Sequence, residues 1–128
     1  MNWTTYFDEE NRILEVIFVG DSTLNDLIEA VRYSLDFSQK NGVNLYLADC
    51  RAYLPHDSNS IFNSYFLGKF YEEIVVDRNF REAIIIPSDR TTVDTLSFFE
   101  TVVQNRGFSV RLFKDINMGR EWLLDSTK

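Results

Sequence analysis

The chain has 128 residues, 45% of them hydrophobic, and its 20 acidic and 13 basic residues give a formal net charge of −7. A chain of this length and apolar content is expected to fold as one packed domain without the help of a metal or a disulfide. The acidic balance argues against broad binding to nucleic-acid phosphates and against electrostatic docking on anionic lipid, because both need clustered Lys and Arg.

The N-terminal sequence MNWTTYFDEE lacks the basic and apolar regions of a signal peptide. No apolar run approaches the ~20 residues that a membrane helix needs. Cys50 is the only cysteine, which excludes an internal disulfide and argues against a cysteine-based zinc site. We therefore expect a cytoplasmic protein with no integral membrane segment, no metal and no cofactor.

The first elements form a predicted hairpin followed by a helix. Two apolar runs, residues 3–7 and 12–20, flank the polar turn DEEN and read as paired strands, the second ended by Gly20. Helical spacing then recurs over residues 21–42. Asp21, Ser22 or Thr23 is expected to cap this helix, and Gly42 suits its left-handed exit.

Strands and helices then alternate to the end of the chain. Buried strands are predicted at residues 43–50, 81–87 and 108–113. Helices are predicted at residues 59–76, at 91–107 with Thr91 or Thr92 as cap, and at 115–125 with Asp115 as cap. This order predicts a single α/β domain with a mixed, mostly parallel sheet, an antiparallel N-terminal edge strand and helices on both faces.

Four strings along the chain carry a family resemblance: VIFVGDSTLNDL, LYLADCR, REAIIIPSD and VRLFKDINMGREWL. Together with the element order they resemble the SpoIIAA-like family, the STAS-type fold of anti-sigma-factor antagonists, and the branch grouped with Sec14-type lipid-binding domains. The resemblance covers nearly the whole chain and implies this fold and a regulatory role. In the antagonists a Ser or Thr after an Asp at a strand end is phosphorylated, whereas this chain has Asp49-Cys50-Arg51 there, so that switch is not expected.

Polar residues follow three of the predicted strands, at Gly20-Asp21-Ser22, Asp49-Cys50-Arg51 and Ser88-Asp89-Arg90-Thr91. Ligands of open parallel sheets bind outside the carboxyl ends of the strands, which makes Asp49, Arg51, Ser88, Asp89 and Thr91 candidate ligand-binding residues. The favoured alternative is structural: Asp21 and Thr91 cap helices and Asp49 pairs with Arg51.

Nothing in the sequence predicts catalysis. His56 lies beside Asp57 and Ser58, but neighbours in a loop do not converge as a nucleophile and its base do, and an exposed loop histidine is favoured. Cys50 at the end of a buried strand is more typical of an inert apolar residue than of a nucleophile. A response-regulator site is also rejected, because no acidic pair follows the first parallel strand.

The predicted helix at residues 59–76 is apolar over more than one face. One interpretation is a helix buried on two sides, or on one side plus a homodimer contact. The other is a lid over an apolar pocket lined by Phe62, Tyr65, Phe66 and Phe70, with a cavity beneath Phe62 and Phe66. Gly68 would favour movement of such a lid, or would equally permit close packing.

These observations favour a non-enzymatic regulatory or protein-interaction module that forms a homodimer or binds a regulatory protein partner, with no nucleic acid. The alternative is a binding protein or sensor for a small apolar or lipid-like ligand held under the aromatic helix.

Overall fold

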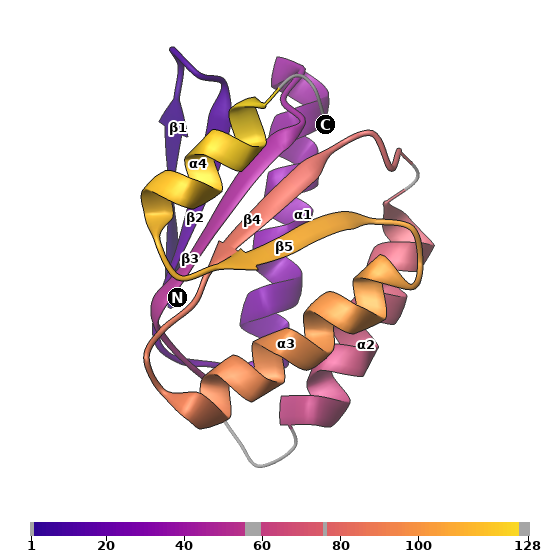
Figure 1. The fold of residues 1–128 in the computed structure, drawn as a ribbon. Helices are drawn as coiled ribbons and strands as arrows, with labels where there is room; N and C mark the ends of the chain where they lie inside the picture. Colours follow the sequence, from indigo (N-terminus) through magenta and orange to yellow (C-terminus); the bar gives the residue numbers. More distant parts are fainter. Residues whose placement is uncertain (1, 56–59, 76, 126–128) are drawn as a thin grey trace.

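Five strands lie side by side in one sheet in the order in which the chain forms them, β1-β2-β3-β4-β5 (Figure 1). The structure is a computed structural model that describes residues 2–55, 60–75 and 77–125. The strands are β1 (Trp3–Asp8), β2 (Ile13–Ser22), β3 (Leu45–Pro55), β4 (Arg81–Ile85) and β5 (Ser109–Phe113). The helices are α1 (Leu24–Asn41), α2 (Ser60–Ile74), α3 (Arg90–Gln104) and α4 (Ile116–Leu124).

The sheet is mixed, as the sequence predicts. β1 pairs antiparallel with β2, and every other pair of neighbours is parallel. The helices α1, α2 and α3 each connect one strand to the next in the same direction, so right-handed crossovers place all three on one face of the sheet. The helix α4 follows the last strand and covers the opposite face (Figure 1). The predicted α/β fold with helices on both faces is therefore confirmed.

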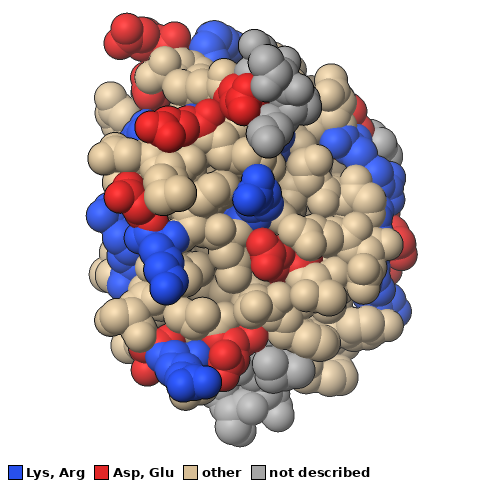
Figure 2. Space-filling view, in the orientation of Figure 1, with Lys and Arg blue, Asp and Glu red and all other residues tan. Residues whose placement is uncertain are grey.

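Two cores follow from this arrangement. The larger lies between the sheet and α1, α2 and α3, on what we call the three-helix face, and includes Leu14, Phe18, Tyr71, Phe99 and Val103. The smaller lies under α4, on the α4 face, where Leu123 packs on side chains from three neighbouring strands. Acidic and basic side chains are interspersed over the surface on the α4 side of the molecule (Figure 2).

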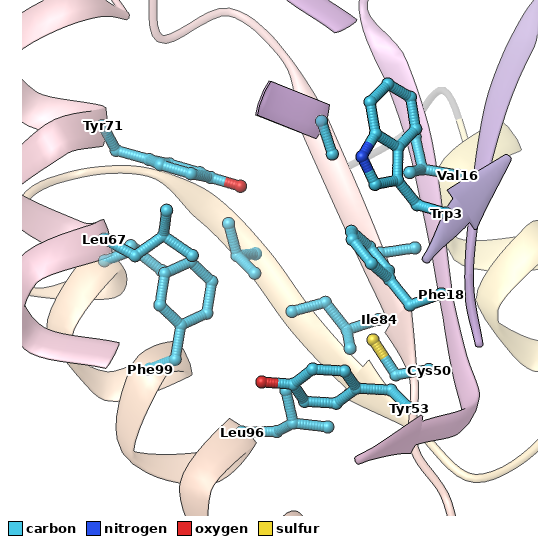
Figure 3. Close-up of a cluster of buried hydrophobic side chains, with 14 of the residues drawn as sticks. Trp3, Val16, Phe18, Cys50, Tyr53, Leu67, Tyr71, Ile84, Leu96 and Phe99 are labelled. Carbon is cyan, nitrogen blue, oxygen red and sulfur yellow. The ribbon is translucent and has the colours of Figure 1, made fainter. Parts of the chain in front are cut away.

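Three predicted strand ends are wrong. β4 ends at Ile85 and not at Pro87. β2 continues past Gly20 to Ser22, and β3 continues to Pro55, because the two strands stay paired over these residues. Their register shifts between Ile17 and Val19, where β3 holds one more residue than β2. This bulge changes the alternation along β3, so that Cys50 and Tyr53 both point into the three-helix core (Figure 3).

The helix ends were partly predictable. Thr23 caps α1 by accepting from the backbone N–H of Asp26, which completes a capping box, and Gly42 ends the helix with φ 65°. Asp115 caps α4 as expected. The cap of α3 is Asp89, two residues before Thr91 and three before Thr92, because its carboxylate accepts from the N–H and the hydroxyl of Thr92.

The contact between α2 and α3 explains Gly68. A Cβ atom at this position would lie 2.3 Å from Cγ1 of Val102 on α3. Only a residue without a side chain lets the two helices approach so closely. The close-packing interpretation of Gly68 is therefore the one that the geometry supports. None of the described helices has both the length and the apolarity to span a bilayer.

Candidate ligand-binding site

Asp49 and Arg51, two of the candidate ligand-binding residues, form an ion pair with each other. Arg51 Nε donates to Asp49 Oδ1 at 2.9 Å, and Arg51 Nη2 donates to Oδ2 at 2.8 Å, a bidentate ion pair between neighbours on the α4 face of β3. The Arg51 side-chain hydrogen bonds, followed by its backbone N–H, hold the pKa of Asp49 below its usual value. This pairing agrees with the structural alternative that the sequence favoured.

Of the three candidates after β4, Asp89 has a structural role as the cap of α3. The hydroxyl and backbone N–H of Thr92 hold the pKa of Asp89 below its usual value, consistent with its role as helix cap. Ser88 and Thr91 are exposed. Asp49 pairs with Ile85, the last residue of β4, so the candidates on β3 and those after β4 lie near the same edge of the sheet. In open α/β sheets, a ligand-binding crevice forms at this edge where the strand order reverses. The order β1-β2-β3-β4-β5 has no such reversal, so the topology does not favour a crevice here.

The aromatic residues of α2 do not lie as the lid interpretation required. Phe62, Tyr65 and Phe66 are exposed by 60%, 45% and 48%, and the Phe70 ring lies under the Arg32 guanidinium, 5.1 Å away. None of these four aromatic residues lines either of the two cavities described below. The inward side of α2 instead carries the buried residues Ser64, Leu67, Gly68, Tyr71 and the following Val75.

A cavity of about 560 Å³ opens between α1, the end of α2 and the sheet. It lies at the amino ends of β3 and β4, the opposite end of the strands from the one that the sequence indicated. Its apolar walls come from both helices and the strands, and include Phe18, Val31, Leu35, Tyr46, Ile74, Val75 and Phe80. A second cavity, of about 70 Å³, lies deeper beneath α2 and shares Phe18, Val31, Ala48, Tyr71 and Glu82 with the first.

Glu82 and Tyr71 form the polar centre where the two cavities meet. The Tyr71 hydroxyl donates to Glu82 Oε1 at 2.8 Å. Figure 3 shows the hydroxyl of Tyr71 reaching from α2 toward the strands, with Leu67 and Phe99 below the ring. The rings of Phe99 and Phe108 contact it edge-on at centroid distances of 5.4 and 5.8 Å. The hydroxyl is thus held in place by packing.

Burial raises the pKa of Glu82 to about 7, although the hydrogen bond from Tyr71 acts in the opposite direction. Burial, followed by the charge of Glu82, also raises the pKa of Tyr71 well above its usual value. Among the described residues that line the larger cavity there is no Lys or Arg, and the other acidic group is Asp77 at its exposed rim. The carboxyl group at the polar centre therefore has a hydrogen-bond donor but no cationic partner on the cavity wall.

Catalytic candidates gain no support from the geometry. Cys50 is buried, and this burial raises the pKa of its thiol far above the usual value, which disfavours the nucleophilic thiolate. His56, Asp57 and Ser58 lie outside the described residues. Within the described part of the chain, no three His, Cys, Asp or Glu side chains are grouped as a metal site would need.

Comparisons with family models, with curated proteins and with solved structures found no match. The resemblance to SpoIIAA-like domains therefore stays a prediction, and the chemistry of the cavity carries the functional argument.

Proposed function

We propose that this protein is a binding protein or sensor for a small ligand that enters the larger cavity between α1, α2 and the sheet. The observation that carries the proposal is the cavity itself. At about 560 Å³ it falls in the range of small-molecule sites, and apolar walls around a few fixed polar groups are typical of such sites.

The position of the cavity also favours binding. It lies beside well-packed structure, since Gly68, on the buried side of α2 that also carries Tyr71, lets α2 pack tightly against α3. The wall formed by α1 carries three polar residues, the half-buried Ser34 and Ser38 and the exposed Gln39. An entrance of this kind lets a ligand reach apolar walls without separating the sheet from α3.

Native mass spectrometry of the protein purified from cells, compared with its denatured mass, tests the proposal. We expect extra mass that is lost on denaturation. Ser34→Trp places an indole in the cavity and is expected to abolish the extra mass, whereas Ser97→Trp, on the exposed side of α3, should retain it. A bare wild-type protein that also binds no probe from a set of small amphiphiles would contradict the proposal.

A second candidate function is the protein-interaction module favoured by the sequence, with a second copy of the chain as partner. The observation behind it is the exposed pair Phe62 and Phe66, whose ring centroids lie 5.2 Å apart on the outer side of α2. Aromatic residues are enriched at protein interfaces. Analytical ultracentrifugation of wild type and of the Phe62→Ser, Phe66→Ser double variant tests it: a dimer that dissociates in the variant supports this function, and a wild-type monomer excludes self-association.

A further inference from the structure

We propose that the ligand of the larger cavity is an organic cation, an amine or quaternary ammonium with an apolar body, whose positive group binds beside Glu82 and Tyr71. This inference rests on the proposed function and adds the chemical class of the ligand.

The charged residues that line the cavity favour a cation. Glu82 lies at its inner end and Asp77 at its rim, and no basic side chain lines the wall among the described residues. Two arginines on segments that border the cavity contact aromatic rings outside its lining, Arg32 over the Phe70 ring and Arg78 over the Phe108 ring. A ligand cation would supply the counter-charge that the protein does not place there.

The carboxyl ends of two helices also lie at the cavity. α1 ends at the cavity with Ser38, Gln39 and Gly42, and α2 ends there with Ile74 and Val75. The carboxyl end of a helix carries a partial negative charge from its unpaired carbonyls. The Asn41 carbonyl at the end of α1 already accepts a hydrogen bond from Arg12 Nη2, so of the two ends that of α2, with no basic residue in its last turn, is the one that favours a positive group over an anion.

The aromatic side chains of the cavity favour an organic cation as well. Phe18, Tyr46, Tyr71 and Phe80 all line the cavity, and the rings of Tyr46 and Phe80 contact each other edge-on with centroids 5.6 Å apart. Aromatic faces together with a carboxylate are the combination that binds alkylammonium groups in proteins. The same walls would accommodate the apolar body of the ligand.

The proposal predicts a dependence on pH. The ionisable groups that interact with Glu82 are Tyr71 on α2 and Tyr46 and Cys50 on β3. Asp77 lies at the cavity rim, and the α1 wall contributes uncharged Ser34, Ser38 and Gln39. Burial raises the pKas of the two tyrosines and of the thiol, so these groups stay neutral near pH 7. Glu82, with a pKa of about 7, is therefore the group that ionises there. A permanent cation should bind more tightly as the pH rises through this value.

The experiment compares benzyltrimethylammonium with neopentylbenzene, its neutral isostere, by saturation-transfer NMR and titration. At about pH 8 we expect the cation to bind about tenfold more tightly than the isostere, and at about pH 6 we expect most of this difference to be lost. Glu82→Gln should reduce the affinity for the cation to that for the isostere and remove the pH dependence. Glu73→Gln, which removes an equal charge from the exposed side of α2, should leave both unchanged.

The outcomes separate the two proposals. Equal binding of cation and isostere, or binding of the cation that does not change with pH, overturns the inference about charge and leaves the binding cavity standing. Failure of both probes to bind counts against the cavity as a site for ligands of this size. The pH comparison uses wild-type protein, so the inference remains testable if Glu82→Gln does not fold, and Asp77→Asn then serves as the second variant, with a smaller loss expected for its exposed position.

Discussion

The two faces of the sheet differ in the partners that they give to buried and half-buried acidic side chains. On the α4 face, Arg120 of α4 reaches Glu15 of β2 at 2.5 Å and Asp8 of β1 at 3.5 Å, and Arg51 pairs with Asp49. On the three-helix face, Glu82 receives a hydrogen bond from Tyr71, and no Lys or Arg lines the cavity around it among the described residues.

The packing differs in the same sense. Under α4, Ile13, Leu47, Ala83 and Ile85 are fully enclosed, and a Cβ atom at Gly119 would lie 2.8 Å from Ile85 Cδ1. The three-helix face is larger but holds both cavities. A face with ion-paired acids and filled space is suited to stability, whereas a face whose acid has a tyrosine partner but no Lys or Arg on the described cavity wall is suited to binding.

The largest expected effect is a difference in packing. Leu47→Ala on the filled face should lower the free energy of unfolding by about 2–5 kcal/mol, since a fully buried side chain leaves a cavity. Leu35→Ala, which borders the existing cavity, should cost about half as much. Urea unfolding of the two variants measures the difference, and equal losses would show that the larger cavity is filled in solution.

The next effect is electrostatic. Because the pKa of Glu82 is raised from 4.5 to about 7, the folded state binds this proton more tightly than the unfolded state. The stability that this group contributes is complete below about pH 4.5 and is lost as the pH rises through about 7, a change of about 3 kcal/mol. Unfolding free energies of Glu82→Gln and wild type, measured across this window, should diverge with rising pH in favour of the variant.

Glu15 provides the matched control on the other face. Glu15→Gln weakens the contact with Arg120 and should lower stability near neutral pH, whereas Glu82→Gln should raise it. Two Glu→Gln changes with opposite signs would sharpen the contrast between the faces. The same sign in both would remove it.

The smallest effect concerns the two sides of α2. Gly68→Ala should destabilise the protein by about 1 kcal/mol, because crowding against Val102 exceeds the gain of about 1 kcal/mol that alanine brings to a helix. Thermal unfolding gives the sign, with Lys69→Ala as an exposed neighbour that should change stability little. A stabilised Gly68→Ala variant would mean that α2 is not pressed against α3.

The elements were predictable because their signals are local. Apolar residues at helical spacing, Leu24, Leu27 and Val31, predicted α1 correctly, and Gly42 predicted its end. The end of β3 was predicted at Cys50, five residues too early, because its continued pairing with β2 as far as Pro55 is not visible in the local pattern. Local patterns do not contain strand order, so the missing reversal at the carboxyl edge was not predictable.

The candidate site was predictable only in kind. The sequence indicated that α2 adjoins an apolar space, but its apolar residues surround the helix, so nothing distinguished the inward Tyr71 from the outward Phe62. Glu82 had a usable signal, an acidic residue within the buried strand REAII that faces the same side as Ile84. Its partner on α2 comes from eleven residues earlier, and only the fold brings the two together.

The sequential strand order has a consequence for how the chain is made. The register joins Ile13 to Leu45, Leu45 to Arg81 and Arg81 to Ser109, so each parallel pairing closes over one helix and its connections. No strand has to wait for a distant, later segment before it finds its first neighbour. During synthesis, each new strand can therefore dock on the growing edge of the sheet as it leaves the ribosome, and α4 closes the opposite face last.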